Sequence, residues 1–264
     1  MRFAFWIPAL AAVLVPVIQP TQLRQNPEPP AQSRADSTLP HEPPGLTTIV
    51  NEGWDRKTPP GWTLQDCEEC EAKVSVVQDP SAPHSPPNVL QFRYSGEVGG
   101  EGAGARTRRW PGIKRLYLAL WFKHSANWQS NPSGVNKMLY IGTNQGNGTE
   151  SEGILNYEDA TSITFYQQNG IEDHHRMGGG PSVVKGRWHF VELSATASTG
   201  GRQNGCLSIW VDGMSVVSRC DIRWKVGDDA VFTGIDLDPI LGGGPQRVVG
   251  EQFYWVDHLY ISGK

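Results

Sequence analysis

A lysine and a tyrosine separated by two residues are candidates for acid–base chemistry. Residues 136–140 read Asn-Lys-Met-Leu-Tyr, so Asn136, Lys137 and Tyr140 offer an amide, a cation and a phenol on one predicted strand. Removal of a proton next to a uronate carboxylate needs one group that neutralises the carboxylate and another that takes the proton. These residue types therefore suit a β-elimination at a uronate, with Asn136 as a contact to the sugar.

Two further groups supply cations and imidazoles. Arg106, Arg108 and Arg109 lie just before Trp110, and we expect Arg106 and Arg108 to neutralise or bind a carboxylate. A solvated strand edge that blocks pairing is the alternative. His174 and His175 precede three glycines that can hinge a loop. Adjacent strand residues point to opposite faces, so at most one histidine enters a site, and exposed loop residues are the alternative.

Glycoside hydrolysis is less favoured. It needs two carboxylates, about 5 Å apart in retaining enzymes. The nearest acidic alternation is Asp236-Leu237-Asp238, which lacks a flanking glutamate. The stretch 144–159, rich in Asn, Gly and acids, does not match a calcium-loop spacing, although loop charges there can line a Ca²⁺ site. We expect no required cofactor, with Ca²⁺ left open.

Short strands must position these side chains. From residue 46 onward, alternating or β-branched runs are bounded by Gly, Pro, Asn and Asp, with no good amphipathic helix. The clearer runs are residues 73–77, 89–94, 115–124, 137–141, 162–167, 188–195, 207–211, 215–218, 231–237 and 253–261. This many short strands predicts an all-β fold, a two-sheet antiparallel β-sandwich or jelly roll.

The run 115–124 shows two distinct faces. Period-two alternation places one apolar set in the core, namely Leu116, Leu118, Leu120 and Phe122. The other set forms an aromatic and cationic surface, namely Arg115, Tyr117, Ala119, Trp121 and Lys123.

Four cysteines are expected to form disulfides. Cys67 and Cys70 form a C-x-x-C pair, and Cys206 and Cys220 flank an Asp-Gly hairpin signal. Three pairings are possible, and only one C-x-x-C is present for a four-ligand zinc site. We favour Cys67–Cys70 and Cys206–Cys220. A two-residue turn sets Cys206 opposite Arg219, so a one-residue bulge must bring Cys220 into register.

The N-terminal residues resemble an export signal. After Met1-Arg2, residues 3–18 are apolar and uncharged, short for a membrane span and broken by prolines. We expect a signal peptide over residues 1–20, with an uncleaved anchor as the alternative. Residues 21–45 are Pro-rich and predict a linker, and residues 46–264 predict the folded domain. The expected location is secreted, periplasmic or at the cell surface.

Composition excludes some classes of protein. The 264 residues allow one large domain or two small ones. With 38% hydrophobic and 19% charged residues, the chain is too apolar for a disordered protein. The net charge is −4, from 23 basic and 27 acidic residues, which argues against nucleic-acid binding. Thirty glycines, twenty prolines and ten tryptophans favour a turn-rich β protein.

The second half of the chain resembles a known superfamily. The motifs are Gly-Arg-Trp-His-Phe-Val-Glu at 186–192, Asn-Gly at 204–205, Trp-Val-Asp-Gly at 210–213 and the strand at 254–262. They resemble the concanavalin A-like lectin/glucanase superfamily, especially its polysaccharide-lyase-like and laminin-G-like members. The resemblance implies two curved sheets, one of which binds an extended glycan through stacked aromatic rings. The candidate rings are Tyr117, Trp121, Tyr140, Tyr166 and Trp210, with Lys123, Asn136 and Arg108 as polar contacts.

Two functions from different classes follow. The favoured one is a polysaccharide lyase acting on an acidic polysaccharide, with Lys137, Tyr140, Arg106 and one of His174 and His175 in the chemistry. The alternative is a non-catalytic glycan-binding or adhesion module of lectin or laminin-G type, because this fold hosts both. Neither reading predicts a nucleic-acid partner, a stable membrane span or a particular oligomeric state.

Overall fold

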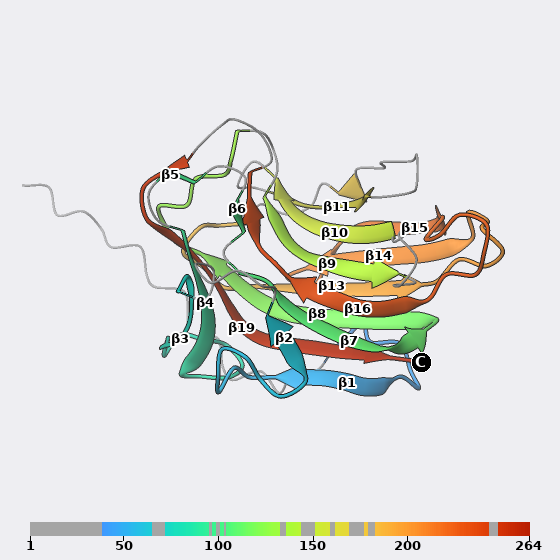
Figure 1. The fold of residues 1–264 in the computed structure, drawn as a ribbon, viewed down its shortest axis with the longest axis horizontal. Coiled ribbons are helices and arrows are strands. Elements are labelled where there is room, and N and C mark those ends of the chain that lie inside the picture. Colours follow the sequence, from blue (N-terminus) through green and yellow to red (C-terminus); the bar gives the residue numbers. More distant parts are fainter. Residues whose placement is uncertain are drawn as a thin grey trace, which may run out of the picture. The chain divides into compact units, whose positions relative to one another are not determined.

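The chain was analysed as a computed structural model (Figure 1). It describes residues 39–64, 72–94, 97–98, 101–102, 104–132, 136–143, 151–158, 162–168, 177–178, 183–242 and 248–264. These residues belong to one compact unit, Arg34–Lys264. Every regular element in these ranges is a β-strand, so the predicted all-β class is confirmed. Over the same ranges, no helix is long and apolar enough to cross a membrane.

Sheet A contains eight antiparallel strands. Their order is β15 (Met214–Ile222), β14 (Gly205–Val211), β13 (His189–Thr196), β8 (Arg115–His124), β19 (Gln252–Gly263), β4 (Asn88–Tyr94) and β3 (Val74–Gln78). The eighth strand, β1 (Thr47–Glu52), pairs with the C-terminal half of β19. Figure 1 shows the C-terminus at the end of β19, beside β1.

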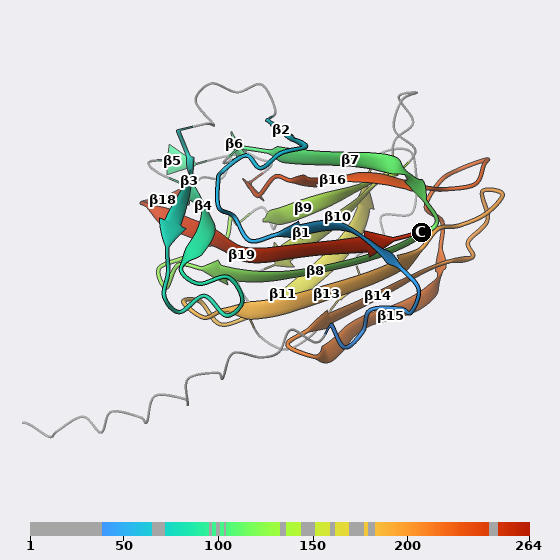
Figure 2. The same cartoon turned by 90° about the horizontal axis from the view of Figure 1, so that it is seen from below.

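Sheet B contains seven antiparallel strands. Their order is β12 (Met177–Gly178), β11 (Ser162–Gln168), β10 (Ser151–Glu158), β9 (Lys137–Thr143), β16 (Phe232–Leu237), β7 (Arg106–Ile113) and β2 (Trp62–Leu64). Two short ribbons pair β17 (Ile240–Leu241) with β6 (Glu101–Gly102) and β18 (Val248–Val249) with β5 (Glu97–Val98). Figure 2 shows the two sheets from a second direction.

The hydrophobic core joins the facing sides of sheets A and B. One buried cluster includes alternate residues of β8, β9 and β16, namely Leu116, Leu118, Leu120, Phe122, Leu139, Ile141, Ile235 and Leu237. Burial of each such side chain contributes about 1.5–3 kcal/mol, so alternation decides which side of a strand faces inward. The predicted core face of β8 is confirmed, and each sheet keeps one face directed away from the core.

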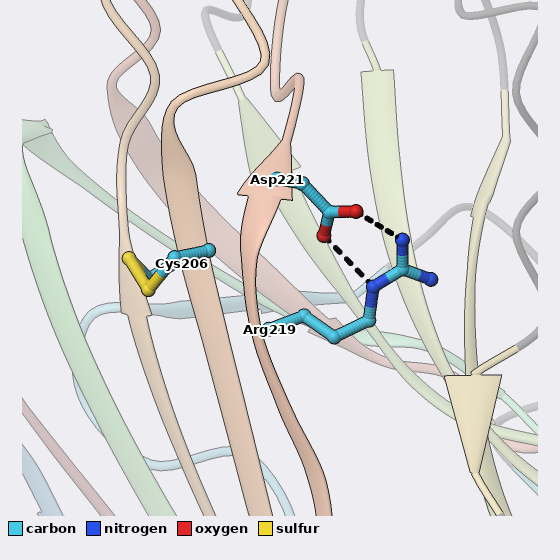
Figure 3. Close-up of a disulfide and its surroundings, with 4 residues drawn as sticks. Cys206, Arg219 and Asp221 are labelled. Atoms are coloured by element: carbon cyan, nitrogen blue, oxygen red, sulfur yellow. Dashed lines mark hydrogen bonds and ion pairs between the residues drawn. A yellow bond between two sulfur atoms is a disulfide. The ribbon is translucent and has the colours of Figure 1, made fainter.

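The β14–β15 hairpin forms as the sequence predicts. Asp212 and Gly213 have φ values of 50° and 78°, which a two-residue turn of this kind requires. The pairing then shifts by one residue between Trp210 and Ile209, and this bulge brings Cys206 level with Cys220. The two cysteines form a disulfide (Figure 3). The predicted Cys206–Cys220 pair is therefore confirmed, while Cys67 and Cys70 lie outside the described residues.

Beside this disulfide, two exposed side chains of β15 pair with each other. Arg219 Nε donates to Asp221 Oδ1 over 2.8 Å, and its Nη2 contacts Oδ2 (Figure 3). An exposed ion pair of this kind contributes little to stability. The covalent link is therefore the main local constraint on the hairpin end.

We predict that replacing both cysteines, Cys206→Ala with Cys220→Ala, lowers the free energy of unfolding by about 3 kcal/mol. The two residues are 14 apart, and closing a loop of about 15 residues in the unfolded chain is worth about that amount. Urea unfolding under oxidising conditions measures the change. An unchanged midpoint with an unchanged slope would show that the disulfide adds nothing to the stability of the sandwich.

A buried histidine links β19 to β1. The His258 ring is 6% exposed, its Nε2 lies 2.6 Å from Asn51 Oδ1, and it stacks on His84 with ring centres 3.8 Å apart. Burial, and then the charge of His84, lower the pKa of His258 from 6.5 to about 4. Burial also lowers the pKa of His124. Both histidines are therefore neutral in the folded protein at neutral pH.

We predict that the free energy of unfolding decreases as pH falls from about 6.5 to about 4. In this window the unfolded chain binds a proton at residue 258 more tightly than the folded chain does, so stability rises with pH. His258→Gln keeps a donor for Asn51 and should flatten part of the slope. Urea unfolding of both proteins between pH 4 and pH 7 measures this, and parallel curves would contradict it.

Candidate functional site

The side of sheet B that points away from the core carries the candidate site, and we call it the outer face of sheet B. Ile141 of β9, Ile235 of β16 and Phe165 of β11 are fully buried in the core. Their neighbours along each strand point the other way. The outer face of sheet B thus collects two phenols, a carboxylate and two cations, namely Tyr140, Tyr166, Asp236, Arg109 and Lys137.

One row of residues crosses the outer face of sheet B from strand to strand. Tyr140 of β9 lies opposite Asp236 of β16 on one side and Ile154 of β10 on the other. The row continues to Tyr166 of β11 and, in the other direction, to Thr107 of β7. Neighbouring strands lie about 4.8 Å apart, so the row crosses about 19 Å. An extended polymer lying across the strands would follow this row.

A β-bulge puts Lys137 and Tyr140 on the same side of β9. The pairing of β9 with β10 shifts by one residue between Leu139 and Lys137, so Met138 is the extra residue. Residues three apart on a regular strand face opposite sides, and the bulge reverses this. The Lys137 ammonium lies 4.9 Å from the centre of the Tyr140 ring, a cation–π contact. Tyr140 is only 8% exposed, so the contact is largely shielded from water.

Arg109, one of the three arginines that the sequence places before Trp110, lies on the outer face of sheet B. Its Nη1 and Nη2 donate to the two carboxylate oxygens of Asp236 over 2.6 and 3.1 Å. Nη1 also donates to the carbonyl of Ile235 over 3.1 Å. Because Asp236 lies opposite Tyr140, this pair adjoins the lysine and phenol.

Arg106 and Arg108 face the inner side of sheet B, whereas Tyr140 lies on its outer face. Arg106 lies opposite Leu237, is 1% exposed, and donates from Nε to the carbonyl of Lys57 over 2.8 Å. Arg108 lies opposite Ile235 and packs against the backbone of residue 61. Alternation along β7 therefore gives the outer face Thr107 and Arg109 instead.

Tyr117, Trp121 and Lys123 lie on sheet A and face away from the core, on the other side of the sandwich from Tyr140. Tyr117 is fully buried and cannot stack on a sugar. Trp121 is half-buried against Phe190, with ring centres 4.9 Å apart. Lys123 forms an ion pair with Asp79. These three residues therefore do not share a surface with Lys137.

A short N-terminal segment covers part of this sheet A face. His41 stacks on Trp210 with ring centres 4.2 Å apart, and its Nδ1 lies 2.8 Å from Glu192 Oε2. Tyr117 donates to Glu192 Oε1 over 2.6 Å. Burial and this hydrogen bond raise the pKa of Tyr117. His41, which lies inside the segment that the sequence assigns to the linker, thus contacts the sandwich.

The other predicted site residues have mixed placements. Tyr166 lies on the outer face of sheet B, in the row of Tyr140. Asn136 is buried, and its Oδ1 accepts from the Asn131 amide over 2.7 Å. His174 and His175 lie outside the described residues, as does much of the stretch considered for Ca²⁺. Within the described part of the chain, no three His, Cys, Asp or Glu side chains gather as a metal site.

Comparison with known proteins identifies similar folds. No protein-family model matches the sequence, and no curated protein matches it. An alginate lyase, Aly36B, solved as a variant with an alginate trisaccharide, has a TM-score of 0.59 at 12% identity over 77% of this chain and 88% of that one. The marine PL-14 alginate lyase from Aplysia kurodai gives 0.58 at 11% identity, over 74% and 88%. The endo-β-1,4-glucuronan lyase from the fungus Trichoderma reesei gives 0.56 at 15% identity, over 83% and 96%.

These similarities show a shared fold. The predicted sandwich is therefore confirmed, and the three similar structures named above are polysaccharide lyases. At 11–15% identity the comparison carries no residue from one chain to another, so the roles of Lys137, Tyr140 and Arg109 must be argued from their own geometry.

We predict that Tyr117→Phe lowers the free energy of unfolding by about 2 kcal/mol and leaves any polysaccharide binding or turnover unchanged. The variant removes a hydrogen bond to the buried Glu192 carboxylate, and bonds to charged groups contribute about 1.5–3 kcal/mol. Urea unfolding and a binding titration measure the two effects. Weaker binding with unchanged stability would instead place the polysaccharide on sheet A.

Proposed function

We propose that the protein is a polysaccharide lyase that cleaves an acidic, uronate-containing polysaccharide by β-elimination. The observation that carries this proposal is the shielded contact between Lys137 and Tyr140 on the outer face of sheet B. The names of the similar structures support it, because they are lyases of alginate and of glucuronan.

The proposed reaction breaks the bond between C4 of a uronate and the glycosidic oxygen. A base takes the proton from C5, the electron pair of that C–H bond becomes the C4–C5 double bond, and the C4–O bond breaks. The departing oxygen takes a proton, so the products are a new chain end and an unsaturated uronate. Negative charge develops on the carboxylate attached to C5, and this charge must be stabilised.

Lys137 and Tyr140 supply the two required functions. The ammonium of Lys137 neutralises the carboxylate. Tyr140 acts as the phenolate: its oxygen takes the C5 proton, and the phenol so formed gives that proton to the departing oxygen. A cation 4.9 Å from the ring stabilises the phenolate. The low exposure of Tyr140 strengthens these interactions, because charges attract more strongly where water is excluded.

Tyr166 serves as a platform for a neighbouring sugar unit. It lies two strands from Tyr140 in the same row and is half-buried. An aromatic ring on a strand face offers an apolar surface to the C–H groups of a sugar. Binding along the row would hold the polymer across the strands, with the scissile bond above Tyr140.

We also propose that the protein is exported. The apolar run at residues 3–18 resembles a signal peptide, and the disulfide between Cys206 and Cys220 suits an oxidising compartment. N-terminal sequencing of protein recovered from the medium or cell surface tests this. Recovery of the chain only from the reducing cytosol, with Met1 or Arg2 first, would contradict export.

We predict that Tyr140→Phe and Lys137→Met each lower turnover at least about 100-fold, the usual contribution of a positioned acid–base group. The melting temperature should stay nearly unchanged, because neither side chain belongs to the core cluster. Ultraviolet absorbance of the unsaturated product measures turnover on a panel of polyuronates, with and without Ca²⁺. Tyr117→Phe is the matched control, a tyrosine-to-phenylalanine change on the other sheet.

Two results would contradict the proposal. A flat absorbance signal for the unaltered protein on every polyuronate, with reducing ends also unchanged, would favour a glycan-binding module. Unfolding of both variants would show that Lys137 and Tyr140 support the sheet instead of the chemistry. A loss of turnover in the variants with an intact melting curve is the expected result.

A further inference from the structure

A second cation lies on the outer face of sheet B, two strands from Tyr140. Asp236 lies opposite Tyr140 across the β9–β16 ladder. Arg109 of β7 lies opposite Gly234, which is level with Gly142 of β9. Lys137 precedes Tyr140 on β9, so the backbone positions of the two cations lie on strands two apart and at different levels along them.

The backbone of β16 fixes the direction of the Arg109 side chain. A Cβ atom at Gly234 would lie 2.5 Å from Cδ and 2.8 Å from Nη1 of Arg109, so the arginine lies directly against the glycine. From there its guanidinium reaches both oxygens of Asp236. The guanidinium of Arg109 is therefore fixed in one orientation, because Gly234 contacts its stem and Asp236 binds its end with both carboxylate oxygens.

The guanidinium keeps donors for a ligand. Arginine has five N–H donors, and the bonds to Asp236 and Ile235 occupy its two terminal nitrogens in three contacts. The side chain of Arg109 is 38% exposed and that of Asp236 is 23% exposed. Ion pairs this exposed contribute only about 0–1 kcal/mol to stability. The Arg109–Asp236 pair therefore contributes little to stability. A role in holding the guanidinium ready for an anionic ligand accounts for it better.

We propose that Arg109 is a specificity-determining residue that binds the carboxylate of the uronate next to the one held by Lys137. This inference rests on the proposed lyase function and names its substrate class. Charged contacts to a carboxylate are about 2.8 Å long, whereas strands β7 and β9, which carry Arg109 and Lys137, lie two strand spacings apart, about 10 Å. One carboxylate therefore does not reach both, and two successive uronates do. Asp236 and Gly234 are positioning residues for Arg109.

The consequence is a preference for blocks of uronates. A homopolymeric polyuronate presents a carboxylate on every sugar unit and satisfies Lys137 and Arg109 together. A copolymer in which uronates alternate with neutral sugars satisfies only one of them. The chain should therefore bind the homopolymer better, and Arg109 should account for the difference.

The test compares Arg109→Gln, Arg109→Lys and the unaltered protein on a homopolymeric polyuronate and on an alternating uronate copolymer. On the homopolymer, Arg109→Gln should raise KM at least tenfold and change kcat less than threefold, because the carboxylate read by Arg109 is not the one at the reacting carbon. Arg109→Lys keeps the positive charge but cannot form two parallel hydrogen bonds to a carboxylate. Its KM should therefore lie between those of the unaltered protein and Arg109→Gln. On the copolymer, Arg109→Gln should leave kcat/KM unchanged. If turnover of the copolymer is too slow to measure, its binding constant should be unchanged.

Arg93→Gln is the matched control. Arg93 also forms an exposed ion pair, with Glu251 over 2.7 Å, but it lies on β4 of sheet A. It should change neither kinetic constant. Equal KM values for Arg109→Gln and the unaltered protein on the homopolymer would overturn this inference and leave the lyase function standing. An unaltered protein without turnover on any polyuronate would overturn the proposed function and this inference with it.

Discussion

The burial of one shared core between two antiparallel sheets is the constraint on which the rest of the molecule depends. Each strand gives alternate residues to that core, and a shift of one residue would exchange its two faces. On β7 this alternation turns Arg106 inward and leaves Arg109 outside. The residues that are buried in the core thus determine which side chains remain on the outer face of sheet B.

Bulges supply what strict alternation cannot. A bulge at Met138 sets Lys137 beside Tyr140, and a bulge near Ile209 sets Cys206 opposite Cys220. In both places the extra residue reverses which side of the strand the following residues face. A side chain that regular alternation would direct to the other side therefore reaches its partner. The first bulge assembles the proposed lysine–phenol pair, and the second closes the hairpin.

The sequence predicts local features well and sheet membership poorly. The all-β class, the core face of β8, the Asp212-Gly213 turn and the hairpin disulfide follow from short-range patterns. The placement of Tyr117 and Trp121 with Lys137 does not hold, because β8 belongs to sheet A and β9 to sheet B. Period-two alternation shows that residues share a face of a strand, but long-range pairing decides which sheet that strand joins.

Charged groups at the centre of sheet A and those beside Tyr140 on sheet B are satisfied in different ways. On sheet A, Glu192 is buried between Tyr117 and His41, and Lys123 is paired with Asp79. A buried charge is tolerated only where hydrogen-bonding partners replace its water. The partners of Glu192 therefore stabilise the fold. On sheet B, the Arg109–Asp236 pair is partly exposed and contributes little to stability. A cation that is rigidly held and still meets solvent is suited to an anionic ligand, and Arg109 has this property beside the proposed lysine–phenol pair.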